Sequence, residues 1–152
     1  MKLALALALA IGVLIMSSPA EGQSRPAVEY FGHPSVNGQP LPFSDAVRVG
    51  DVLYLSGQIG LGPDGKLPDG IEAQTRQAMD NIGAVLKARG LSHGDLFHCT
   101  VFLADMKDWP LFNKVYVPYF PAGKLPARSA FGANGLALGA LLEIECQAYA
   151  GK

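Results

Sequence analysis

The sequence predicts an α+β domain in which a mixed β-sheet carries two α-helices on one face. Five short segments have the residue pattern of β-strands, and two longer segments repeat apolar residues at helical spacing. These segments follow one another in the order β-β-α-β-α-β-β. Because two helices suffice to cover only one side of a single sheet, the other side is expected to lack a helical layer.

The first two strands are expected at residues 46–49 and 52–59, on either side of Gly50-Asp51. A pair of this kind between two β-rich runs is typical of a two-residue hairpin turn. Residues 21–42 are rich in Pro, Gly, Ser and Asn and are expected to form an extended lead-in to the domain at residues 43–150. In the second strand, alternation places three apolar residues on one face: Leu53, Leu55 and Ile59.

The first helix is expected over residues 71–89, with Asp69 as its candidate N-cap. The second is expected from Asp108 as N-cap to Tyr119. Pro110 falls in its first turn, where a missing backbone N–H costs nothing. The remaining strands are expected on both sides of this helix, at residues 97–103, 127–131 and 141–149.

Strand parity predicts which side chains point toward the helices. The covered face is expected to hold Leu53, Leu55, Phe97, Cys99, Val101, Leu103, Leu142, Ile144, Cys146 and Ala148. The uncovered face is expected to hold Tyr54, Ser56, His98, Glu143, Glu145 and Gln147. A semi-polar sheet face without a helix is expected to form a subunit interface or a site.

The two cysteines, Cys99 and Cys146, share the covered face by parity and could be neighbours. We expect buried thiols rather than a disulfide, because a bridge needs close Cα atoms, which parity alone does not guarantee. Two cysteines are also too few for the disulfide framework of a small secreted scaffold.

The composition argues against several functional classes. The 152 residues carry 12 basic and 13 acidic side chains, a formal net charge of -1, which gives no electrostatic basis for binding nucleic acid. The histidines and cysteines lack the spacing of a metal site, so no metal is expected. Residues 60–66 (GLGPDGK) formally match nucleotide-phosphate loops, but they hold turn residues and do not lead straight into a helix, so a surface turn is expected.

Residues 1–20 have the layout of a secretory signal peptide. Lys2 is followed by an apolar run up to Met16, and Ser18 and Ala20 are the small residues expected before a cleavage site. An uncleaved membrane anchor is the alternative, although the run is shorter than the roughly 20 residues that span a bilayer. We therefore expect an exported protein, periplasmic or secreted, that leaves the membrane after cleavage.

Seven segments then stand in a characteristic order and spacing. They are residues 42–47 (PFSDAV), 55–59 (LSGQI), 74–81 (QTRQAMDN), 100–106 (TVFLADM), 113–116 (NKVY), 126–129 (PARS) and 138–145 (LGALLEIE). In these segments the sequence resembles the RidA/YjgF family. Because several linked segments agree, the resemblance is far more specific than any one of them.

The resemblance implies a chorismate-mutase-like α+β subunit that assembles as a homotrimer, with three sites in the clefts between subunits. Many members hydrolyse reactive enamine and imine intermediates, such as 2-iminopropanoate and 2-iminobutanoate, to 2-oxo acids and ammonia. The implied partners are small imino or oxo acids and further copies of the chain, with no nucleic acid. No cofactor is implied.

The family's catalytic residues fall on Arg128 and Glu143 in this resemblance. Arg128 would clamp the substrate carboxylate through two parallel N–H bonds, which Lys cannot reproduce. Glu143, expected on the same sheet face, would accept a proton from the attacking water. A structural ion pair between the two residues at a subunit interface is the alternative reading. The resemblance implies four further substrate-binding positions: Asn113, Phe43, Ser44 and Gly57.

Two positions depart from the family pattern. Phe43 stands where a Tyr is common, which removes a hydroxyl near the substrate, and Ala130 stands where a Cys is frequent. Three hypotheses therefore remain. The first is an imine deaminase, and the second is a protein that binds small carboxylates without turnover. The third class comprises a chaperone-like or interaction trimer and, as another member, a ribonuclease. The net charge near zero and the lack of a basic stripe argue against the ribonuclease.

Overall fold

The structure is a computed structural model that describes residues 25–32, 34–36 and 38–151. The expected signal peptide at residues 1–20 lies outside the described residues. Two α-helices are present in the described part, α1 (Ile71–Lys87) and α2 (Trp109–Tyr116). The strands are β1 (Val28–Phe31), β2 (Ser35–Val36), β3 (Gln39–Pro40), β4 (Ala46–Val49), β5 (Val52–Leu55), β6 (Gln58–Ile59), β7 (Leu96–Leu103), β8 (Ala127–Gly132) and β9 (Leu142–Tyr149).

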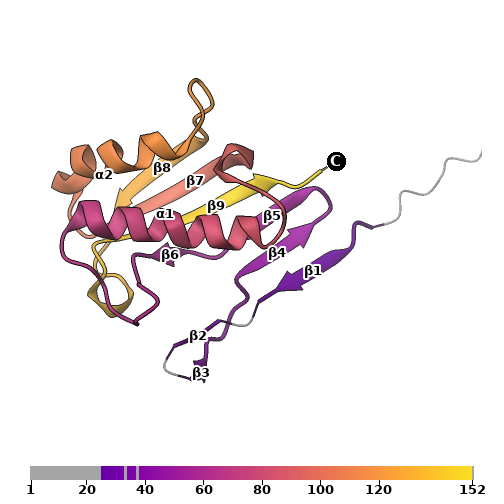
Figure 1. The fold of residues 1–152 in the computed structure, drawn as a ribbon, viewed down its shortest axis with the longest axis horizontal. Coiled ribbons are helices and arrows are strands. Elements are labelled where there is room, and N and C mark those ends of the chain that lie inside the picture. The colour runs from indigo at the N-terminus through magenta and orange to yellow at the C-terminus, as the bar shows by residue number, and fades with distance from the viewer. Residues whose placement is uncertain (1–24, 33, 37, 152) are drawn as a thin grey trace, which may run out of the picture.

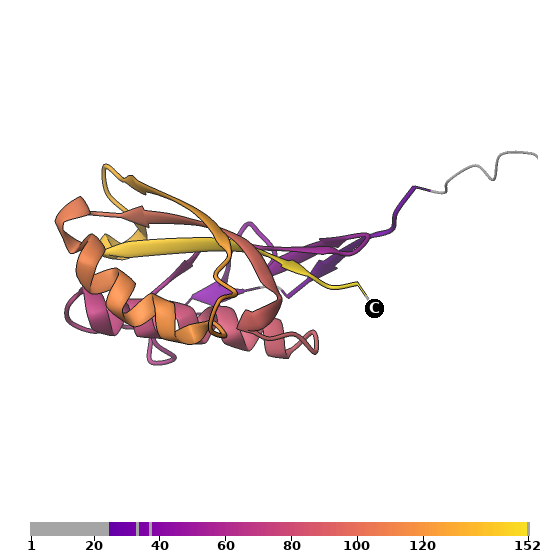
Figure 2. The ribbon, with the colours of Figure 1, turned by 90° about the horizontal axis from the view of Figure 1, so that it is seen from above.

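One mixed sheet organises the fold. Its strand order is β1-β4-β5-β9-β7-β8, and β6 pairs with β9 beside this path. β7 and β8 run parallel, whereas the other paired strands of the sheet are antiparallel. Both helices lie on the same side of the sheet (Figures 1 and 2). The α+β class, the mixed sheet and the placement of both helices on one face are confirmed.

The core lies between the helices and the sheet. Helix α1 contributes Met79, Ile82 and Leu86, each fully buried, and burying side chains of this size stabilises the fold by roughly 1.5–3 kcal/mol apiece. Helix α2 adds Phe112 and Tyr116. The strands supply nearly all the residues that parity assigns to this face: Leu53, Leu55, Cys99, Val101, Leu103, Leu142, Ile144, Cys146 and Ala148.

Phe97 departs from the parity prediction, because the pairing of β7 with β9 slips at its start. Leu96 pairs with Ala148 and His98 pairs with Gln147, so one residue on β7 has no partner of its own. This irregularity turns Phe97 outward, where it is 43% exposed, and Leu96 takes its place in the core. The expectation that Phe97 lies beneath the helices was wrong.

The strand expected over residues 52–59 is divided by a bulge. Three residues, 55–57, stand opposite only two, 145–146. The extra residue reverses the alternation beyond it, so Ile59 pairs with Glu143 and shares its face. The expected grouping of Ile59 with the apolar face was therefore wrong, because a period of two does not reveal a residue inserted within the strand.

The helix starts agree with the sequence at α2 but not at α1. Gly70, not Asp69, is the N-cap of α1, with a φ of 80° that favours glycine. Asp108 is the N-cap of α2, as expected, although its side chain makes no capping hydrogen bond. A 3-10 turn over Val117–Tyr119 then continues the helical path to the expected end.

The lead-in contributes a strand to the sheet. β1 pairs with β4 along its whole length, from Val28 opposite Val49 to Phe31 opposite Ala46. β2 and β3 form a separate small hairpin. The sequence does not reveal β1, because its side chains mostly face solvent at a sheet edge, with Tyr30 69% exposed, and so carry no alternating pattern.

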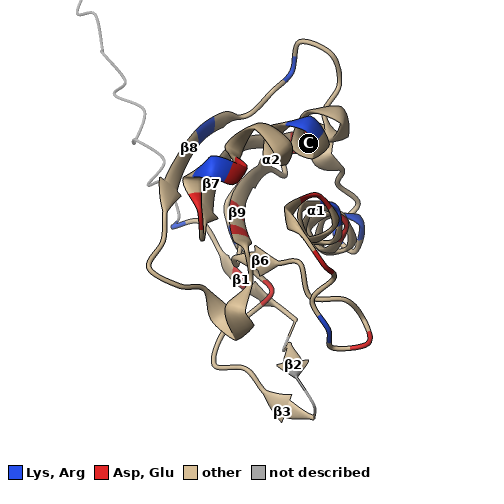
Figure 3. Ribbon diagram, turned by 90° about the vertical axis from the view of Figure 1, so that its left-hand side faces the viewer, with Lys and Arg blue, Asp and Glu red and all other residues tan. Residues whose placement is uncertain are grey.

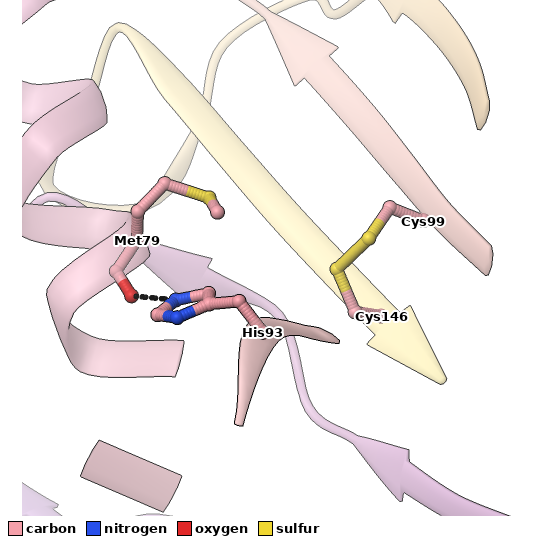
Figure 4. The surroundings of a disulfide bond; sticks show 4 residues. All are labelled: Met79, His93, Cys99 and Cys146. Carbon is pink, nitrogen blue, oxygen red and sulfur yellow. Dashed lines mark hydrogen bonds between the residues drawn. A yellow bond between two sulfur atoms is a disulfide. The ribbon is translucent and has the colours of Figure 1, made fainter. Parts of the chain in front are cut away.

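Cys99 and Cys146 form a disulfide, so the expectation of two buried thiols was wrong (Figure 4). The two residues are direct partners on the antiparallel strands β7 and β9, and their Cα atoms lie 4.1 Å apart. Parity places both side chains on the same face, but only the register between the two strands brings them opposite one another. Both residues are buried in the core.

Removing the disulfide is expected to lower the free energy of unfolding by about 4 kcal/mol, which is the loop-closure entropy for a sequence separation of 47. Urea denaturation of the variant Cys99→Ala/Cys146→Ala against the wild type measures this loss. Reductant should destabilise the wild type and leave the double variant unchanged. A wild type whose stability does not change on complete reduction would contradict the prediction.

Candidate functional site

A cavity of about 490 Å³ lies next to the bulge between β5 and β6. Its lining includes Phe43, Gly57 and Glu143, three of the residues expected at the site. The volume falls in the range of roughly 300–1,000 Å³ that is typical of small-molecule sites. Ser44 follows Phe43 and is tied to the bulge, since its carbonyl oxygen accepts a hydrogen bond of 2.6 Å from Ser56 Oγ.

The bulge brings the Gly57 backbone against the Glu143 carboxylate. A Cβ atom at Gly57 would overlap Glu143 Oε1, so this close approach requires glycine. Burial and, secondly, repulsion from Glu145 raise the pKa of Glu143 above the ordinary value of a glutamate. A carboxylate with a raised pKa at the wall of a cavity is a candidate general base.

Gly57→Ala is expected to reduce kcat/KM roughly 100-fold for the imine substrates that the sequence resemblance implies, because the added methyl group displaces the Glu143 carboxylate. The matched control is Gly94→Ala, whose Cβ would meet its nearest neighbours at an ordinary 3.5 Å. Steady-state kinetics of both variants, with circular dichroism to check the fold, provide the comparison. Wild-type activity in a folded Gly57→Ala protein would remove Gly57 from the site.

Arg128 lies in a different environment from Glu143. In the parallel pairing of β7 with β8, Arg128 stands opposite Cys99, so its side chain points to the helix-covered face. The expectation that Arg128 and Glu143 share a sheet face was therefore wrong. Alternation shows which residues of β8 lie on the same side of that strand, but only the pairing of β8 with β7 decides which side points to the helices. The Arg128 guanidinium carbon lies near the ring centroids of three α2 residues, at 4.9 Å from Trp109, 5.4 Å from Phe112 and 4.7 Å from Tyr116.

Helix α2 also carries two buried polar atoms without a hydrogen-bond partner among the described residues, Asn113 Oδ1 and Tyr116 Oη. A buried polar atom left unpaired costs about 1–3 kcal/mol, so each of these atoms is a candidate to meet a ligand or a second chain. Burial raises the pKa of Tyr116 to about 12 against the opposing effect of Arg128, so the phenol keeps its proton and is able to donate.

The expected site residues thus fall into two groups within one chain. The Glu143 group consists of Phe43, Gly57 and Glu143, which line the cavity, and of Ser44, which follows Phe43 and accepts the hydrogen bond from Ser56. The Arg128 group lies at α2 and consists of the expected residues Arg128 and Asn113, which Tyr116 joins in the structure. No member of the Arg128 group lines the cavity. One chain alone therefore does not bring a carboxylate clamp and a general base to the same place.

Sequence reasoning did not single out Trp109, Tyr116 or Leu138 as site residues. Trp109 and Tyr116 stand with Phe112 at helical spacing on α2. This aromatic stripe, in a chain that also carries a candidate Arg, was the signal available in the sequence. Leu138 lines the cavity from a turn, and no local pattern marks it.

Other features of the described residues concern possible ligands. They contain no group of three or more His, Cys, Asp or Glu side chains that could hold a metal ion. None of their helices is both long and apolar enough to cross a membrane. Residues 60–66 form a turn in which the Gly62 N–H donates to the Lys66 carbonyl at 2.8 Å, as expected. Lys and Arg are spread over several elements (Figure 3).

Comparison with known proteins gives the family. The fold and the cavity define a small α+β domain with a cavity of ligand size beside its sheet. The family model described as endoribonuclease L-PSP matches residues 38–150. The chain belongs to this family, the RidA/YjgF family that its sequence segments also indicate. Solved structures of relatives share its chorismate-mutase-like α+β fold.

Individual relatives extend the comparison. The chain is 43% identical to the 2-iminobutanoate/2-iminopropanoate deaminase of Mus musculus over 72% of its own length and 82% of that protein. It is similar to the structure of YyfA, a Rid family protein of Yersinia pestis, with a TM-score of 0.73 and 37% identity, covering 81% of this chain and 99% of that one. The structure of E. coli TdcF with bound serine matches with a TM-score of 0.69 and 31% identity, over 76% and 94%.

Proposed function

We propose that this protein hydrolyses reactive 2-imino acids of the 2-iminopropanoate and 2-iminobutanoate type to 2-oxo acids and ammonia. The observation that carries the proposal is the Glu143 carboxylate, which has a raised pKa and stands at the wall of a ligand-sized cavity against the Gly57 backbone. Relatives that carry the name of this deaminase support it. The proposed reaction requires no cofactor.

The reaction needs a held water, a proton acceptor and an anchor for the substrate carboxylate. The water oxygen bonds to C2 of the imine, the C=N electron pair moves to nitrogen, and the Glu143 carboxylate takes a proton from the water. From the protonated imine this addition gives a carbinolamine. The proton then passes from Glu143 to the amino nitrogen, the C–N bond breaks and ammonia leaves. The hydroxyl proton on C2 returns to Glu143 as C2–O becomes a carbonyl, and the ammonia carries that proton away as ammonium. Arg128 would hold the carboxylate during both steps through its paired N–H donors.

We further propose that the chain acts as a homotrimer in which each site takes the Glu143 group from one subunit and the Arg128 group from its neighbour. The separation of the two groups within one chain supports this arrangement. The uncovered sheet face supports assembly, since it exposes aromatic residues such as Tyr54 and Phe131, at 45% and 54%. A stable monomer at micromolar concentration in sedimentation would contradict both the homotrimer and the site shared between subunits.

Export is proposed on two observations. The first is the signal-peptide layout of residues 1–20. The second is the Cys99–Cys146 disulfide, because such bridges form and persist in oxidising compartments outside the cytoplasm. N-terminal sequencing of periplasmic or secreted protein should start at Glu21, and full-length protein in the membrane fraction would refute cleavage.

Turnover of freshly generated 2-iminopropanoate by the purified protein tests the proposed activity. The single Trp of the chain provides a binding assay as well, since Trp109 lies beside Arg128. Titration with 2-oxobutanoate should change its fluorescence in the wild type. Binding without any turnover would favour the alternative of a small-carboxylate-binding protein over the enzyme.

Glu145→Gln is expected to move the acid limb of the pH profile to lower pH. Glu143 acts as a base only when ionised, so kcat/KM falls as the pH drops through its pKa. Removing the negative charge of Glu145 lowers that pKa, because this charge contributes to raising it. Asp64→Asn, in the exposed turn before α1, is the control and should leave the limb in place. An acid limb that stays in place or moves up in Glu145→Gln would argue against Glu143 as the base.

A further inference from the structure

The cavity beside Glu143 has an apolar interior, and its polar lining residues are largely engaged with the protein itself. Asn81 Nδ2 donates to the carbonyl oxygens of Ile59 and Leu61 at 3.1 and 3.0 Å, and Asn81 Oδ1 accepts from Gln77 at 2.8 Å. Gln58 Nε2 donates to the Ser56 carbonyl at 3.3 Å. The remaining surface is dominated by aliphatic and aromatic side chains: Leu41, Phe43, Ile59, Leu61 and Leu138.

The charges at the cavity are of one sign. Asp45 and Glu143 both line it, and among the residues that the structure describes no Lys or Arg does. An anionic side chain of a substrate would therefore be repelled inside this cavity, whereas the C1 carboxylate that every 2-imino acid carries is assigned to Arg128 of the neighbouring subunit. An apolar side chain, in contrast, gains by leaving water against the aliphatic wall.

Leu138 is held in the cavity wall by an unusual backbone. Among the described residues other than glycine, it alone has a positive φ, 58°. Such a conformation is unfavourable for a side chain with a Cβ and persists only where the surrounding structure imposes it. The turn presents Leu138 at the cavity with 64% of its surface exposed, so its side chain is free to contact a ligand.

We propose that this cavity binds the side chain of the substrate and selects 2-imino acids with large apolar side chains, branched aliphatic or aromatic, with Leu138 as a specificity-determining residue. The inference rests on the proposed function, because it assigns C2 of the substrate to Glu143. A cavity of about 490 Å³ is far larger than the methyl group of 2-iminopropanoate requires. The reacting carbon sits at Glu143 and Gly57, and the rest of the volume accommodates the side chain.

Imines produced in place by an L-amino-acid oxidase from leucine, phenylalanine, alanine and glutamate provide the test. The wild type should show a kcat/KM at least about tenfold higher for the leucine and phenylalanine imines than for the alanine imine. Its kcat/KM should be lowest for the glutamate imine. Leu138→Ala should lower the leucine-to-alanine ratio roughly three- to tenfold. Leu125→Ala, which removes a similarly exposed leucine outside the cavity, is the matched control and should keep the ratio.

The failure of this inference differs from the failure of the proposed function. Turnover of the alanine imine with equal or lower rates on the leucine and phenylalanine imines would overturn the selectivity and leave the deaminase intact. If no imine is hydrolysed, the deaminase fails, and calorimetry with 4-methyl-2-oxopentanoate and 2-oxobutanoate decides the selectivity by itself. Tighter binding of the branched acid that weakens in Leu138→Ala supports the inference, and equal or weaker binding overturns it.

Discussion

Replacing Arg128 by alanine is expected to abolish imine hydrolysis while the protein stays folded. The loss has a direct cause, since the substrate carboxylate loses its bidentate partner and is no longer oriented for attack. Arg128→Lys keeps the charge but not the fork, and should lose about 2–4 kcal/mol of transition-state stabilisation, or roughly 30- to 1,000-fold in kcat/KM. Kinetics, circular dichroism and sedimentation of both variants check these expectations.

The control for Arg128 is another arginine in the same kind of contact. The Arg89 guanidinium carbon lies 4.2 Å from the ring centroid of Phe31, far in sequence from either group of site residues. Each cation–π contact is worth about 0.5–2 kcal/mol, so Arg128→Ala, which removes three such contacts, should lose more stability than Arg89→Ala, which removes one, and both variants should stay folded. Only Arg128→Ala should lose activity. Wild-type turnover in Arg128→Ala would exclude Arg128 as the carboxylate clamp. Unfolding of Arg128→Ala into monomers would favour a structural ion pair between Arg128 and Glu143 at a subunit interface.

Mixing two inactive variants is expected to restore activity. Arg128→Ala retains the Glu143 group, and Glu143→Gln retains the Arg128 group. After denaturation and refolding together in equal amounts, hybrid trimers contain interfaces in which both groups are intact. Random assembly of a cyclic trimer from equal parts makes about a quarter of all sites competent, so about a quarter of wild-type activity should return.

The two variants refolded separately and combined afterwards are the control for this experiment, and their mixture should stay inactive while subunits do not exchange. Recovery only after joint refolding would place the two groups in different subunits. A jointly refolded mixture without activity, in which mass spectrometry detects hybrid trimers, would contradict the shared site. The result is informative because one chain separates Arg128 and Glu143 onto opposite faces of its sheet.

Several expectations follow from the sequence because local periodicity records which face of an element is buried. The α2 stripe of Phe112 and Tyr116 and the alternation along Leu142, Ile144 and Cys146 are examples, and burial in the structure agrees with both. Amphipathic spacing depends only on the element itself, so no knowledge of its neighbours is needed. The linked sequence segments from residue 42 onward indicate the family for a similar reason, since their order and spacing are carried by the chain.

Register is the property that local pattern does not contain. The bulge at residues 55–57 reverses the face of Ile59 and brings Gly57 against Glu143, yet the sequence there reads as an uninterrupted strand. The pairing of Cys99 with Cys146 depends on how far β7 and β9 are shifted along one another. An inserted residue or a slip of one position changes these contacts without altering the apolar content of either strand.

The sequence by itself therefore determined the fold class, the covered face and the family of this protein, because each depends on patterns within single elements or on their order. Only the tertiary structure decided that the cysteines are bridged, that β1 joins the sheet, and that Arg128 points toward the aromatic rings of α2 and away from Glu143. These features rest on contacts between residues far apart in the chain. Their physical origin is strand pairing, in which backbone hydrogen bonds and bulges between distant segments set the partner and the face of each side chain.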